Sequence, residues 1–116
     1  MAPTNAVILA QGIYFVITGV WPILSIRTFI AVTGPKKDVW LVKTLGGLIA
    51  VAGGALISAS LNDLSLPAII LSCGSALTLG WIDIWYSLKN VISKVYLADA
   101  VVQSLLVFAL CMSLYV

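Results

Sequence analysis

The sequence predicts an all-α membrane protein built as a four-transmembrane-helix bundle. Only 9% of its 116 residues are charged and 62% are hydrophobic, whereas a soluble domain carries about 25% charged residues to wet its surface. The apolar residues form four long runs without an ionisable side chain, and about 18 such residues suffice for a transmembrane span. Backbone groups in lipid must pair within their own segment, so each run is expected to be helical. The alternating polarity of a β-barrel is absent.

We expect two helical hairpins in one integral membrane domain, residues 1–116, with spans near residues 5–26, 39–60, 66–88 and 98–116. The first run resembles a signal peptide in position only. Its first basic residue is Arg27, so a basic n-region is lacking, and the run is long enough to span. We therefore expect the mature protein to retain it.

Turn and cap residues mark the connections between these spans. Gly34-Pro35 predicts a turn, and Asp38 is expected to cap the second span by accepting hydrogen bonds from its first backbone N–H groups. Ser65 and Pro67 predict the start of the third span, because they suit a cap and an early helical position.

The charges predict the orientation of the bundle. All six basic residues belong to, or lie near, the loops at residues 27–38 and 89–97, and the turn at Asp63 has none. The positive-inside rule places these two loops on the cytoplasmic side of the cell inner membrane and both termini outside. Four tryptophans lie towards the same end and predict an interfacial aromatic belt. The alternative is an aromatic-lined cavity open to the cytoplasm, with Trp21 and Trp81 deepest. The four are Trp21, Trp40, Trp81 and Trp85.

Two stripes of small residues predict how the second and third spans pack. Lys43 shares a helical face with one stripe and Asp83 with the other, so close approach of the two helices is expected to bring these opposite charges together. On this interpretation Asp83→Asn lowers stability. The alternative is that Lys43 extends to the headgroups and Asp83 is hydrated. The stripes are Gly46, Gly47, Ala50 and Gly54 on the second span, and Ser72, Ala76 and Gly80 on the third.

A polar cluster is the candidate site. Asp99 and Gln103 lie four residues apart on the fourth span and therefore share a face. We expect them to join Lys43 and Asp83 inside the bundle, the alternative for Asp99 being a helix-start residue that satisfies the helix dipole.

Catalytic chemistry is not predicted, because the chain has no His and no Glu. It lacks paired Glu residues, a phosphate-binding loop and a nucleophile elbow. Cys73 and Cys111 lie in apolar runs, where free cysteines pack as small hydrophobic residues. We expect no enzyme activity, no cofactor, no metal and no nucleic-acid partner.

The segments FIAVTGPKKDVWLV, residues 29–42, and VYLADA, residues 95–100, carry a resemblance to a family. With them the chain resembles small uncharacterised bacterial four-helix inner-membrane proteins that share a F-x-x-V-T-G-P-K-x-D-x-W-L-V segment. The resemblance implies a four-helix bundle in a bacterial inner membrane and no particular activity. The chain differs from the small multidrug exporters of similar length, which carry an essential Glu in their first helix.

Three function classes remain, and the first is preferred. It is a non-enzymatic accessory or assembly subunit that binds a larger membrane complex or a second copy of itself through small-residue helix faces. The alternative is a small transporter or ligand-binding bundle that uses the cytoplasmic-side polar cluster. A membrane enzyme acting on lipid or quinone is the least favoured, because its catalytic groups are lacking.

Overall fold

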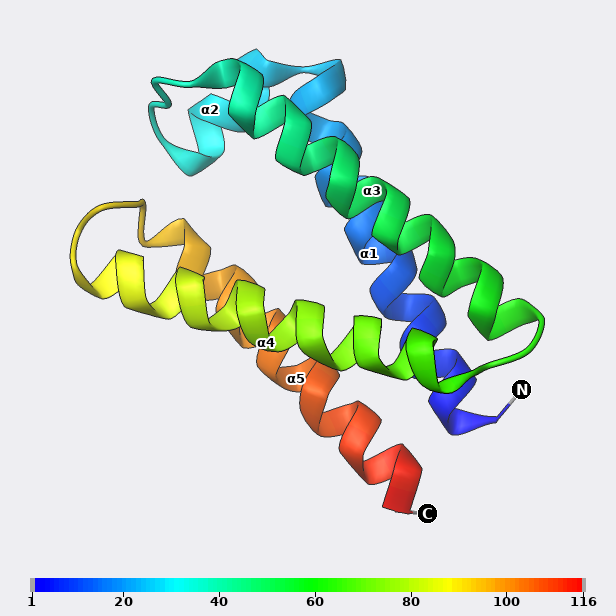
Figure 1. The fold of residues 1–116 in the computed structure, drawn as a ribbon. Coiled ribbons are helices and arrows are strands. Elements are labelled where there is room, and N and C mark those ends of the chain that lie inside the picture. The colour runs from blue at the N-terminus through cyan, green and yellow to red at the C-terminus, as the bar shows by residue number, and fades with distance from the viewer. Residues whose placement is uncertain (1, 116) are drawn as a thin grey trace.

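The computed structural model describes residues 2–115, which form five α-helices and no strand (Figure 1). Four of the helices are long and apolar enough to cross a membrane, so the all-α, four-span prediction is confirmed. The expected limits of the chain at residues 1 and 116 lie outside the described residues. The helices are α1 Pro3–Leu24, α2 Ile26–Thr33, α3 Val39–Leu61, α4 Leu66–Leu88 and α5 Val95–Tyr115.

The short helix α2 was not predicted, since its residues were expected to form part of a loop. Helix α1 ends at Leu24, two residues after Pro22, whose missing N–H leaves one carbonyl of the helix without its usual donor. The chain then turns at Ser25 and starts α2. Trp21 holds the two helices together: its indole N–H donates to the Thr28 hydroxyl at 2.9 Å. The neighbouring Phe29 ring packs edge-on against it, with centroids 5.2 Å apart.

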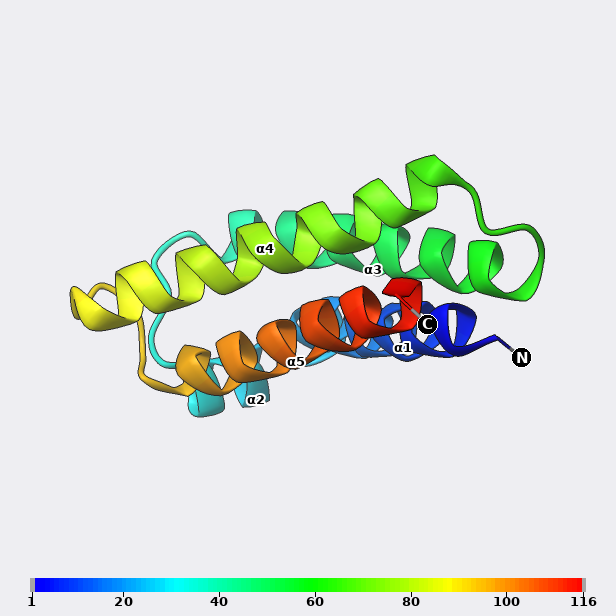
Figure 2. The same ribbon diagram turned by 90° about the horizontal axis from the view of Figure 1, so that it is seen from below.

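The long helices pair as two hairpins, α1 with α3 and α4 with α5. Helix α1 also contacts α5, whereas α3 and α4 make few contacts. Figure 1 shows α3 and α4 meeting at the turn that joins them and diverging towards the other end, and Figure 2 shows the same turn at one end of the bundle. We call that other end, formed by α2 and the connections at residues 34–38 and 89–94, the basic end. Both termini lie at the opposite end (Figure 1).

Four glycines bring the backbones of α1 and α3 into direct contact. A Cβ built on Gly19 would lie 2.4 Å from the carbonyl oxygen of Gly46, and one built on Gly53 would lie 2.6 Å from that of Gly12. The spacing of seven residues is the same on both helices, so the two close contacts recur along one helical face. The α1–α3 interface is therefore closed to any larger residue at these positions.

The predicted packing of the second span against the third is wrong. Gly46 and Ala50 face α1, where Gly19 lies against both. A Cβ built on Gly47 would approach only the Cδ1 atom of Ile23 in α1, at 3.8 Å, and a Cβ on Gly54 would meet nothing within 4 Å. The physical reason is that α1 offers two glycines in register with Gly46 and Gly53, which permits a closer approach than the small residues of α4 do.

The small residues of α4 do face inward, but towards α1 and α5. Ser72 and Gln11 of α1, both buried, exchange two hydrogen bonds: the serine hydroxyl donates to the amide oxygen, and the amide N–H donates to the Ser72 carbonyl at 2.9 Å. Gly80 lies beside Gln103 of α5, whose Cβ is 3.4 Å from a Cβ built on the glycine. Ala76, between them on the same face, is buried. This stripe therefore joins the two hairpins.

Candidate functional site

Three of the four predicted polar residues lie together near the basic end, and a tyrosine of α1 joins them. Asp83 comes from α4, Asp99 and Gln103 from α5, and Tyr14 from α1. We call these four residues the acid site. Asp83 is 6% exposed and Gln103 2% exposed, whereas Tyr14 and Asp99 are half-buried.

Asp99 is the centre of the acid site. The Tyr14 hydroxyl donates a hydrogen bond to its Oδ1. The Gln103 amide N–H groups point at both carboxylate oxygens at 3.4 and 3.5 Å, which makes them weak donors. The carboxyl of Asp83 on α4 lies near the Asp99 carboxyl. Asp99 thus lies where three of the four long helices, α1, α4 and α5, come together.

Two buried acceptor atoms of the acid site receive no hydrogen bond from any described residue: Oδ2 of Asp83 and Oε1 of Gln103. A buried acceptor without a donor costs about 1–3 kcal/mol, and more when it is charged. The charged group beside Asp83 is Asp99, which repels it. A bound proton or another cation would stabilise two neighbouring buried carboxylates.

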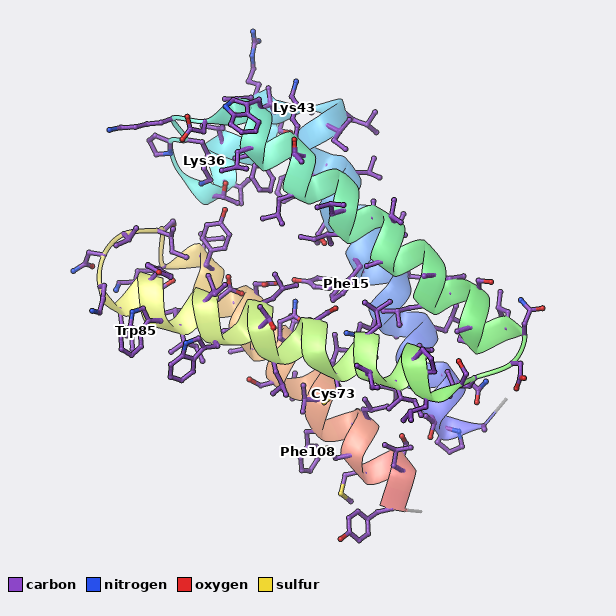
Figure 3. The ribbon with its side chains drawn as sticks, viewed as in Figure 1. Phe15, Lys36, Lys43, Cys73, Trp85 and Phe108 are labelled. Carbon is purple, nitrogen blue, oxygen red and sulfur yellow. The ribbon has the colours of Figure 1, made fainter. Side chains whose placement is uncertain are left out.

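Lys43 does not supply that cation, and its predicted place in the cluster is wrong. Its side chain is exposed near the start of α3, and Figure 3 shows it on the side of α3 away from α4. The reason is the divergence of α3 from α4 towards the basic end, which separates Lys43 from Asp83. The alternative in which Lys43 extends towards the headgroups agrees with this exposure.

The sequence of α4 and α5 explains how the acids meet. One face of α4 is buried along its whole length because its members recur every three or four residues. The α4–α5 connection is closed by Lys94, whose ammonium donates to the Ser87 carbonyl, and by Asn90 with a positive φ of 61°. Asp99 lies four residues into α5, so it is not a helix-start residue. The buried face of α4 consists of Ser72, Ala76, Gly80, Asp83 and Ser87.

The expected cap residues stand where predicted but do not cap with their side chains. Asp38 and Ser65 directly precede α3 and α4, yet neither side chain hydrogen-bonds to its helix. The Asp38 backbone carbonyl instead accepts from the N–H groups of Leu41 and Val42.

Tyr14 is the site residue that sequence reasoning missed. It lies three residues after Gln11 and four before Thr18, so the three polar side chains share one face of α1. That spacing was the available signal. The spacing did not identify Tyr14 as a site residue, because a tyrosine in an apolar run is also typical of the membrane interface.

The tryptophans lie on the outside of the bundle rather than around an internal cavity. Trp40 is 68% exposed and Trp81 64%. Trp81 and Trp85 stack with centroids 5.5 Å apart, and the Lys89 ammonium lies 4.7 Å from the Trp85 ring centre. Trp21 is half-buried against α2. The alternative, a cytoplasmic cavity lined by Trp21 and Trp81, is therefore not formed by the described residues.

Metal-ion ligands do not gather in groups of three among the described residues. Cys73 and Cys111 are free thiols, half-buried and exposed respectively. The oxygen atoms of the acid site, two carboxyls, a phenol and an amide, suit a proton or a hard or organic cation rather than a soft metal.

Comparison with known proteins adds no assignment. No protein-family model matches the chain, and neither a curated protein nor a solved structure matches it significantly.

Proposed function

We propose that this protein is a small membrane transporter that binds a proton or another cation at the acid site. The observation that carries the proposal is the group of Asp83, Asp99 and Gln103, in which the buried Asp83 Oδ2 and Gln103 Oε1 have no hydrogen-bond partner and no basic side chain of the described residues bonds to the carboxyls. Ionisable residues inside a membrane protein are costly and mark ion pathways. A pair of acids that only a cation can stabilise is a binding site for that cation.

The arrangement of the hairpins supports transport rather than fixed binding. Asp83 and Asp99 belong to the α4–α5 hairpin, and Tyr14 brings the α1–α3 hairpin to them through its hydrogen bond to Asp99. The two hairpins touch over a smaller area than the helices within each hairpin do. A change of charge at Asp99 therefore acts on the contact between two separately packed bodies, which suits a rocking motion of one against the other.

The proposed membrane and orientation follow from the basic residues. The lysines and arginine gathered in and near the loops at 27–38 and 89–97 favour a cytoplasmic basic end in a bacterial inner membrane, with both termini outside. The acid site then lies in the half of the membrane nearer the cytoplasm.

Proton uptake by liposomes tests this function. The purified protein is reconstituted with a pH-sensitive dye inside the vesicles, and a potassium diffusion potential drives cations inward. The wild type is expected to acidify the vesicles faster than protein-free liposomes do. Asp83→Asn and Asp99→Asn are expected to reduce the rate to that of empty liposomes, because an amide cannot carry the proton.

Asp63→Asn is the matched control, because Asp63 is exposed in the turn at the opposite end of the bundle. Its rate should equal that of the wild type. Equal rates for the wild type, Asp83→Asn and Asp99→Asn would contradict the proposal.

An accessory subunit is the second candidate, and one observation favours it. Gly54 on α3 and Gly74 on α4 are exposed, and a Cβ at either would meet nothing within 4 Å. A helix of another protein can approach closely at such positions. Mass spectrometry of proteins that co-purify from the native membrane tests this candidate, and Gly54→Leu should abolish the association. Recovery of the chain alone would contradict it.

A further inference from the structure

A groove between α4 and α5 opens on the outer, lipid-facing side of their hairpin. Its volume is about 470 Å³, within the range of small-molecule pockets. Gly80 leaves its floor free of a side chain, and the exposed rings of Trp81 and Phe108 form parts of its wall. Figure 3 shows Phe108 on the outer side of α5.

Gln103 connects this groove to the acid site. It lines the groove, and its amide N–H groups point at Asp99. Its Oε1 is buried and accepts no hydrogen bond from a described residue, so the polar residue that lines the groove beside Gly80 has an acceptor without a partner. Asp83 lies between two lining residues of α4, Gly80 and Ile84, in the same turn of helix.

We infer that the groove admits an amphipathic organic cation, an aromatic or aliphatic body bearing one ammonium group, and that this cation is the substrate class of the proposed transporter. The ammonium lies at Gln103 Oε1 beside the two carboxyls, and the body lies against Trp81 and Phe108. This inference rests on the proposed function.

The chemistry of the groove separates this class of ligand from others. A neutral acyl chain fills the apolar wall but leaves the carboxyls and Gln103 Oε1 without a partner. An anion is repelled by Asp83 and Asp99. An inorganic cation has no apolar part that could pack in the groove. An organic ammonium compound has such a part, and its charge is also attracted to a nearby aromatic face.

Binding of the organic cation conserves the charge of the site. Before binding, one proton is shared between Asp83 and Asp99. The ammonium brings one positive charge, the shared proton leaves to water, and no covalent bond other than that O–H bond breaks. One proton is therefore released for each organic cation bound.

The probe is benzylammonium, whose N–H groups can donate to Gln103 Oε1, compared with ethylbenzene, its neutral isostere of the same shape. Equilibrium dialysis in detergent measures binding, and a pH indicator in weak buffer measures proton release. The ammonium compound is expected to bind saturably with proton release, and the isostere is not. Equal uptake of both compounds would overturn the inference, because partition into detergent would then explain it.

Phe108→Ala and Leu105→Ala form a matched pair on α5. Their side chains are 65% and 62% exposed, but only Phe108 lines the groove. Phe108→Ala is expected to weaken binding of benzylammonium about ten-fold, because it removes the aromatic surface against which the body of the cation packs. Leu105→Ala should bind as the wild type does. Equal affinities for the two variants would also overturn the inference.

The two proposals fail separately. Wild-type liposomes that take up protons while the protein does not bind benzylammonium would refute the organic substrate and keep the proton site. Liposomes that take up neither protons nor benzylammonium would refute the proposed function itself.

Discussion

Replacing Gly53 with alanine should weaken the packing of α1 against α3. The new Cβ would lie 2.6 Å from the Gly12 carbonyl oxygen and 2.8 Å from the Cβ of Phe15, where ordinary contact begins at 3.4 Å. The distance to the Gly12 carbonyl oxygen, a backbone atom, is therefore 0.8 Å shorter than ordinary van der Waals contact. Because a backbone atom inside a helix cannot rotate away, the two helices must separate by a similar distance.

The cost follows from that separation. A gap of about 0.5–1 Å forfeits a quarter to a half of each dispersion contact along the interface. Overpacking of this kind costs about 1–3 kcal/mol in free energy of unfolding. Alanine is a better helix former than glycine by about 1 kcal/mol, and that gain offsets part of the loss.

Gly54→Ala isolates the steric cost. Gly54 is the adjacent residue of the same helix, but a Cβ there meets nothing within 4 Å, so the variant gains helix propensity without a clash. The free energy of unfolding of Gly53→Ala is therefore expected to lie about 2 kcal/mol below that of Gly54→Ala. Unfolding by sodium dodecyl sulfate in mixed micelles, followed by far-UV circular dichroism, measures both. Indistinguishable unfolding curves would refute the backbone contact between α1 and α3.

Three further predictions concern the polar contacts of the bundle. Ser72→Ala should lower the free energy of unfolding by about 1 kcal/mol, because it removes the hydroxyl donor to the buried glutamine of α1; Ser75→Ala on the same helix is the control, and the same micelle titration decides. Lys36→Met should lower the thermal unfolding midpoint in detergent, because the Lys36 ammonium donates to two backbone carbonyls at 3.0 and 3.2 Å and lies 5.2 Å from an aromatic ring centre of α5. The adjacent, exposed Lys37→Met should leave that midpoint unchanged, and equal midpoints would contradict the contact. Asp83→Asn should raise stability near neutral pH by about 1 kcal/mol, since its amide supplies a donor to the neighbouring carboxylate of Asp99 without a bound proton; a fall in stability would instead restore the idea of a Lys43 partner.

The polarity of the side chains was enough to find the spans. Runs without an ionisable residue specify where the chain crosses the membrane, because each buried charge in lipid is costly whatever the neighbouring helices do. The α2 segment escaped this reasoning. Ile26–Thr33 is too short to span and too apolar to mark a loop, and only its contacts with Trp21 show that it is a helix.

The acid site was predictable in part. Asp99 and Gln103 share a helix, so their spacing alone brought them together. Asp83 was correctly expected inside the bundle, but its partner was not, because the choice between Lys43 and Asp99 depends on which helices are neighbours. Small residues occur on every helix of this chain, and their presence does not say which pairs meet.

Composition and the spacing of charges by themselves determined that the helices are suited to lipid, how many spans there are, and which polar residues should face away from lipid. Tertiary structure alone decided that α3 packs on α1, that Lys43 stays outside and that two acids face each other with a tyrosine. The physical reason is that transfer into lipid is a property of each segment, whereas pairing depends on the register of glycines on two helices distant in sequence.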